Sequence, residues 1–226
     1  MRDRLLKRFK IKESIDRAIP DIVEEPDEIR TRTNQLKELA KEKQFYSSWK
    51  QSVRPIFQNH RFSLLEKDDF HAVEYQSTQV IVLPTIEQEY VVMPKVRRQI
   101  LGGAVWELPA GGAQGNEIPE DAALRELGEE TGISISEPSR LLPLDTLVVS
   151  PNRLPMFPLI YRVDLCKEEF ETRSAHDDEV ESVASFSSDK IREMILSGEI
   201  ITSITLAILG RYLISKNSPC GTDKHN

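Results

Sequence analysis

The sequence has few cysteines and no long hydrophobic run. Only Cys166 and Cys220 occur among 226 residues, which excludes a disulfide framework and a cysteine-rich zinc site and makes a cytoplasmic location the expectation. No stretch approaches the roughly 20 apolar residues that a membrane-spanning helix requires. No apolar segment of a secretory signal follows the charged start of the chain. We therefore expect neither membrane insertion nor secretion.

Basic residues are fewer than acidic residues. The chain has 37 acidic and 30 basic residues, a net charge of -7, which disfavours a protein that coats nucleic acid. Hydrophobic residues still make up 39% of the chain, so a packed core is expected. The acidic excess fits a protein that gathers carboxylates around a hard cation.

The chain divides into three segments. Residues 1–52 form a charged extension in which apolar residues at a 3.6-residue period predict a helix near 34–50. That helix either docks on the domain or a second copy, or binds a partner. Residues 53–213 are expected to form one α+β domain, and residues 214–226 a disordered tail.

Short β-rich runs and three helical segments alternate within the domain. Strands are predicted at 62–65, 71–75, 79–83, 89–93, 104–108, 141–149 and 157–165. Helices are predicted at 119–131, 188–197 and 202–213. Strands mixed with helices in this order predict an α/β/α layered domain.

The helix at 119–131 has clear signals at both ends. Pro119 suits its first turn, where a missing N–H costs nothing, and Gly132 suits the position that stops it. Glu126, Glu129 and Glu130 stand at i, i+3 and i+4, so one helical turn carries three carboxylates on one face. Such a face is either a solvated acidic surface or a site for a divalent cation, with Mg²⁺ the usual choice beside phosphates.

The surroundings of these glutamates favour the second interpretation. Residues 111–133 read G-x5-E-x7-R-E-L-x-E-E-x-G-I, which resembles the Nudix box at all nine fixed positions. The resemblance spans about 53–213 and implies the Nudix fold, an α/β/α sandwich with a mixed β-sheet. It also implies Mg²⁺ or Mn²⁺ held by Glu126, Glu129 and Glu130, with Arg125 and Glu117 joining loop to helix.

The segment before the box resembles one group within the family. The run W-E-L-P-A-G at 106–111 is similar to the approach to the box in ADP-ribose pyrophosphatases and nucleotide-sugar hydrolases. That similarity implies a metal-binding backbone carbonyl at Ala110 and places Glu107 at the substrate.

Candidates for the remaining catalytic groups lie outside the box. The resemblance implies a catalytic base from the acidic loop at 176–181, with Glu179 favoured over Glu181 and Asp178; Glu129 is a further catalytic candidate. A plain solvated loop is the alternative. Arg97 and Arg98 resemble the arginines that meet the terminal phosphate, and Lys95 and Arg153 are weaker candidates. The aromatic residue that stacks on the base is expected among Phe57, Tyr75 and Phe157.

The resemblance implies hydrolysis of a nucleoside diphosphate derivative, ADP-ribose or a nucleotide sugar, by a homodimer formed through residues 53–75. A dinucleoside polyphosphate, a capped RNA end or a damaged nucleoside triphosphate is the alternative substrate, because loops outside the box choose it. A nucleotide-binding regulatory or scaffold module is the non-enzymatic alternative.

Overall fold

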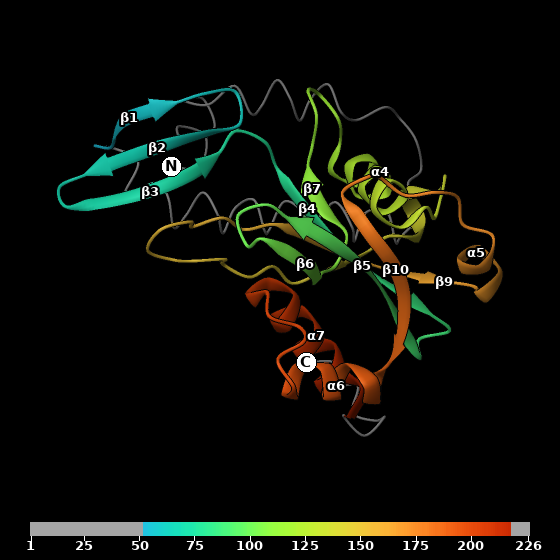
Figure 1. Ribbon diagram of the computed structural model, residues 1–226. Helices are drawn as coiled ribbons and strands as arrows, with labels where there is room; N and C mark the ends of the chain where they lie inside the picture. The colour runs from blue at the N-terminus through green and yellow to red at the C-terminus, as the bar shows by residue number, and fades with distance from the viewer. Residues whose placement is uncertain (1–51, 218–226) are drawn as a thin grey trace, which may run out of the picture.

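The computed structural model describes residues 52–217, so the helix predicted near 34–50 lies outside the described part. Two sheets are seen in Figure 1. The smaller, antiparallel sheet consists of β1 (Arg54–Gln58), β2 (Phe62–Lys67) and β3 (Phe70–Tyr75). Its strands leave the rings of Phe57 and Phe70 more than half exposed. The homodimer stays a prediction, and these rings are its candidate contacts.

The larger sheet has the strand order β10-β5-β4-β9-β8, with β6 beside β5 and β7 beside β4. Strands β4 and β9 run parallel while the other pairs run antiparallel, so the sheet is mixed, as the resemblance implied. Its strands are β4 (Gln79–Ile86), β5 (Tyr90–Arg98), β6 (Gly103–Trp106), β7 (Ala110–Gly112), β8 (Leu142–Leu144), β9 (Leu159–Leu165) and β10 (Val180–Ser187).

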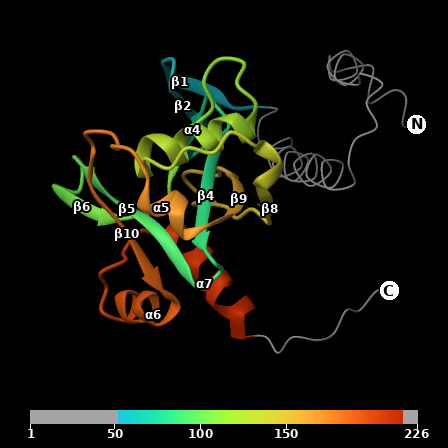
Figure 2. The same ribbon diagram turned by 90° about the vertical axis from the view of Figure 1, so that its right-hand side faces the viewer.

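Helices cover both faces of this sheet (Figures 1 and 2). One face packs against α4 (Pro119–Thr131), and the other packs against α6 (Ser188–Leu196) and α7 (Ser203–Asn217). Successive side chains of β4 point to opposite faces of the sheet and so enter two separate cores. Val80 and Val82 belong to the core under α4, and Ile81 and Leu83 belong to the core under α6 and α7. The predicted α/β/α sandwich is therefore confirmed.

Several predicted boundaries need correction. The predicted strand at 141–149 shrinks to the three residues of β8, and α7 continues to Asn217, inside the segment expected to be a tail. The sequence also missed β1, β10 and the short helix α5 (Lys167–Glu171). A 3-10 turn, η1, spans Pro138–Arg140. Within residues 52–217, no helix is long and apolar enough to cross a membrane.

Helix α4 begins and ends as its sequence signals predict. Pro119 occupies the first turn, and Gly132 ends the helix in the left-handed region at φ 74°, where its N–H donates to the Gly128 carbonyl. The main chain of Ser174 lies directly against Gly132, and Ser174 N donates to Gly132 O at 2.9 Å. A Cβ built on Gly132 would overlap the Ser174 carbonyl oxygen.

We expect Gly132→Ala to destabilise the fold by about 2–4 kcal/mol, because left-handed strain of about 1–2 kcal/mol adds to the overlap with Ser174. Gly198→Ala is a matched control: Gly198 has φ 73° but no heavy atom within 4 Å of a built Cβ. Urea unfolding of both variants measures the difference. Equal losses in the two variants would show that Ser174 yields without cost.

Candidate active site

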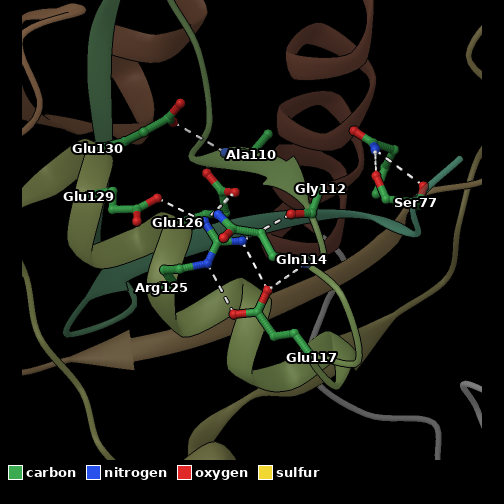
Figure 3. A network of polar contacts seen from close by, with 10 residues as sticks. Ser77, Ala110, Gly112, Gln114, Glu117, Arg125, Glu126, Glu129 and Glu130 are labelled. Atoms are coloured by element: carbon green, nitrogen blue, oxygen red, sulfur yellow. Dashed lines mark hydrogen bonds and ion pairs between the residues drawn. The ribbon is translucent and has the colours of Figure 1, made fainter. Parts of the chain in front are cut away.

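Arg125 joins the glycine-rich loop to α4 (Figure 3). Its Nε donates to Glu117 Oε1 at 3.0 Å, and its Nη2 donates to the Gly112 carbonyl at 2.9 Å. Glu117 in turn accepts from the Gln114 N–H at 2.9 Å, and the hydrogen bond from Arg125 is the main cause that lowers the pKa of Glu117. The structural role that the resemblance implied for Arg125 and Glu117 is confirmed.

The same guanidinium also binds two of the three carboxylates predicted to hold the metal. Arg125 Nη1 donates at 2.8 Å to both Glu126 and Glu129 (Figure 3). Glu126 is only 9% exposed and its carboxylate lies against Gly111, whose missing side chain makes the space. Burial raises the pKa of Glu126, and the opposing contact with Arg125 does not cancel this effect.

Glu130 lies apart from this pair, in contact with the backbone of β7. Its Oε2 accepts from the Ala110 N–H at 3.2 Å. Burial raises the pKa of Glu130 to about 8. The hydrogen bond from the Ala110 N–H and the positive charge of Arg98 lower this pKa, but their effect is smaller than that of burial. In the part of the chain that the structure describes, no three His, Cys, Asp or Glu side chains are gathered as they would be around a metal ion. Instead, Arg125 supplies the positive charge between Glu126 and Glu129.

The donor set nevertheless fits a divalent cation. Carboxylate oxygens are the ligands that Mg²⁺ prefers. Burial keeps the pKa values of Glu126 and Glu130 above their ordinary value, so both charges lack full compensation here. A bound cation would supply that compensation. The carbonyl of Ala110 remains a predicted ligand, and its amide is what the structure shows in contact with Glu130.

The raised pKa of Glu130 predicts how stability depends on pH without metal. The folded chain holds this proton up to about pH 8, whereas the unfolded chain releases it near the ordinary value of 4.5. The folded state therefore binds more protons between these values, so the free energy of unfolding should fall as the pH rises from 4.5 to 8.

Urea unfolding in EDTA at several pH values across this window measures the slope. Glu130→Gln should make the slope shallower, because glutamine does not titrate, and Glu126, whose pKa is also raised, accounts for part of the slope that remains. Glu117 and Glu169 have lowered pKa values, so their protonation changes the free energy of unfolding only at pH values below this window. An identical slope in the wild type and Glu130→Gln would contradict the assignment.

A second group of charged residues faces α4 from β5 and the segment after β6. Arg98 donates to Glu107 Oε2 from Nη2 at 2.5 Å and from Nε at 3.2 Å. This hydrogen-bonded pair is the main cause that raises the pKa of Arg98, and the carboxylates of Glu130 and Glu179 act in the same direction. The structure thus brings Glu107, Glu130 and Glu179 within electrostatic range of Arg98.

Arg97 does not lie on the same face of β5 as Arg98. Successive residues of a strand point to opposite faces, and Val92 of β5 belongs to the core under α4 while Met93 belongs to the other core. Arg98 therefore lies on the α4 face and Arg97, which is exposed, on the opposite face. The expectation that both arginines meet phosphate needs this correction, although the Arg97 N–H does bind the Glu179 carbonyl at 2.8 Å.

The acidic loop is attached at both ends to the site. Asp177 N donates to the Glu129 carbonyl at 2.8 Å at the end of α4, and Glu179 is held against β5. Glu181 was expected in this loop, but it lies exposed in β10, where the pairing with β5 shifts between Val180 and Ser182. The structure therefore favours Glu179 over Glu181 by position.

Two of the three aromatic candidates line one cavity. Tyr75 and Phe157 border a space of about 200 Å³ together with Ser77 and Gln79, which lie against Gly112. Phe57 instead packs on Phe62 in the smaller sheet, with ring centroids 5.6 Å apart. The sequence offered no signal for this cavity, because β3 and the loop before β9 meet only in the folded chain.

Comparisons with known proteins agree with this geometry. The NUDIX domain model matches residues 75–201, more than half of the chain. Proteins named Phosphatase NudJ from Escherichia coli K12, Escherichia coli O157:H7 and Shigella flexneri are each 30% identical over 96 residues, 42% of this chain. The match spans 60% of the length of those relatives. The matched residues contain the whole box, α4 and every strand of the larger sheet, so the chain belongs to the Nudix hydrolase family.

Proposed function

We propose that this chain hydrolyses the pyrophosphate bond of a nucleoside diphosphate derivative, ADP-ribose or a nucleotide sugar. The products would be a nucleoside monophosphate and a sugar phosphate. One observation carries the proposal: two glutamates of α4, the buried Glu126 and the partly buried Glu130, lie against the backbone of β7, with Arg98 and Glu179 on the adjoining wall. Such a set of carboxylates and one guanidinium suits a cation and the phosphate oxygens around it.

Glu126 and Glu130 would hold the divalent ion, with Glu129 beside them. When bound, the ion neutralises the charge that develops on the phosphate oxygens during attack by water. Arg125 must then release Glu126 and Glu129, while its contacts to Glu117 and Gly112 keep the loop in place.

Glu179 is the residue that we assign as proton acceptor for the attacking water. Its carbonyl accepts from the Arg97 N–H, and its negative charge contributes to the raised pKa of Arg98, so Glu179 lies within electrostatic range of that guanidinium. Glu129 and Glu181 are the alternatives. Arg98, aligned by Glu107, would meet a phosphate oxygen through its planar guanidinium.

The cavity beside Gly112 supports the assignment of the substrate class. Its volume of about 200 Å³ lies below the roughly 300–1,000 Å³ usual for a whole ligand, so it would hold one ring of a larger substrate. Tyr75 and Phe157 supply aromatic walls, and the contact of Ser77 with Gly112 connects the cavity to the box. A base in the cavity and a diphosphate at α4 is the arrangement that we propose.

Ion-exchange analysis of the products tests the proposal. The panel contains ADP-ribose, ADP-glucose, GDP-mannose, NADH, a dinucleoside tetraphosphate, capped RNA and 8-oxo-dGTP, each with Mg²⁺ or EDTA. We expect AMP and ribose 5-phosphate to form fastest from ADP-ribose, with no turnover in EDTA. Faster turnover of the tetraphosphate, the capped RNA or 8-oxo-dGTP would overturn the substrate class, and no turnover with Mg²⁺ or Mn²⁺ would favour a binding module.

A further inference from the structure

A second, larger cavity of about 380 Å³ lies on the opposite side of the larger sheet from α4. Strands β4, β8 and β9 form its floor and α7 its wall. Its lining residues Leu83 and Ile160 belong to the core under α6 and α7, on the sheet face away from the box. The cavity is therefore separate from the site described above.

The lining combines apolar walls with two arginines. Four aliphatic side chains border the space, together with Arg162 from β9 and Arg211 from α7, while Asp145 is the single carboxylate in the lining. The aliphatic residues are Leu83, Leu144, Ile160 and Ile208. Positive charge therefore exceeds negative charge in the lining, and the volume lies in the range usual for small-molecule sites.

Arg162 carries an unused hydrogen-bond donor. Its Nε is buried without a partner among the described residues, although its Nη2 donates to Asp164 Oδ2 at 3.2 Å. A buried donor left unpaired costs about 1–3 kcal/mol, more for a charged group, so such groups are rare without a partner. Nε itself is covered, but the Arg162 side chain as a whole is 30% exposed, so other atoms of it are open to a ligand.

Arg211 is fixed at the same cavity by its own contacts. Its Nη1 donates to the carbonyls of Asp145 and Thr146, at 2.7 and 3.1 Å. Those contacts join α7 to the segment after β8 and use one nitrogen of the guanidinium. Arginine has five N–H donors, so most of its capacity for an anion is left.

We propose that this cavity binds an organic anion, a phosphate or carboxylate group attached to a small apolar body. The oxyanion would bind Arg162 and Arg211, and the apolar body would lie among Leu83, Leu144 and Ile208. Asp145 in the lining would disfavour ligands with negative charge at both ends. This site adds to the proposed hydrolysis and does not depend on it.

Calorimetric titration of the full chain in EDTA tests the proposal without metal at α4. The probes are phenyl phosphate, phenylacetate and the neutral benzyl alcohol. We expect saturable 1:1 binding of at least one of the two anions, and at least about tenfold weaker binding in Arg162→Met and in Arg211→Met. Tighter binding of phenyl phosphate would identify the ligand as a phosphate ester, and tighter binding of phenylacetate as a carboxylate.

Two further variants keep the test decisive. Arg192→Met is the matched control, because Arg192 lies on neighbouring α6, pairs with exposed Asp189 and does not line the cavity. Leu144→Phe should weaken binding by narrowing the cavity while both arginines remain. No saturable binding of either anion, equal binding of benzyl alcohol, or unchanged binding in the Arg162 and Arg211 variants would overturn the proposal.

Discussion

Glu130→Gln is expected to lower kcat with Mg²⁺ by at least about 100-fold, equivalent to about 2.7 kcal/mol of lost transition-state stabilisation. Glutamine keeps the shape of the side chain and an oxygen that can accept from the Ala110 N–H. It removes only the negative charge, which the proposed mechanism needs next to a divalent ion. The fold should be retained, because burial already makes that charge unfavourable without metal.

Asp121→Asn is the control for Glu130→Gln. Asp121 lies exposed in the first turn of α4, away from the carboxylates that face β7, and its replacement makes the same change in charge. We expect its turnover to stay within about twofold of the wild type. Steady-state rates across a range of Mg²⁺ concentrations measure both variants. Wild-type turnover by a folded Glu130→Gln protein would exclude Glu130 from the mechanism.

Gly111→Ala is expected to lower activity by about 10–100-fold with little loss of stability. A Cβ at this position would overlap both carboxylate oxygens of Glu126. The obstacle is the end of a flexible side chain, so the carboxylate turns away and the backbone stays where it is. The substitution therefore displaces a proposed metal ligand and does not disturb the fold. The Mg²⁺ concentration for half-maximal activity should rise as a result.

Gly103→Ala is the control for Gly111→Ala. Gly103 lies in β6, and no heavy atom lies within 4 Å of a Cβ built there. Its turnover and Mg²⁺ dependence should match those of the wild type. Thermal unfolding of both variants checks that the fold is intact. An unchanged Mg²⁺ dependence in Gly111→Ala would show that the space beside Gly111 does not position Glu126.

Local signals predicted α4 well because they act within a few residues. Pro119 and Gly132 specify the two ends by backbone geometry, and Ala123 and Leu127 specify the buried face, so no distant contact was needed. The ionic contact between Arg125 and Glu117 followed from the resemblance to the box and was confirmed.

Features that depend on distant pairing were harder to predict. The strand predicted at 89–93 ends just before Pro94, yet β5 continues to Arg98 with Pro94 opposite Val183. With Arg97 and Arg98 outside the predicted strand, the sequence did not indicate that their side chains point to opposite faces of the sheet. Strand β10 was missed because its small polar residues form a strand only by pairing with β5.

The order in which the larger sheet is joined has a consequence for how the chain folds during synthesis. The parallel pairing of β4 with β9 places Val80 opposite Leu159, and β10 returns to β5 with Phe186 opposite Val91. Contacts between such distant segments close slowly, because long loops must be ordered first. The helix that carries the acidic residues therefore leaves the ribosome before β9 and β10 exist to complete the sheet. Its apolar face can already pack on β4, β5 and β7, but the sheet beneath it is incomplete during that interval, when chaperone binding would protect the nascent chain from aggregation.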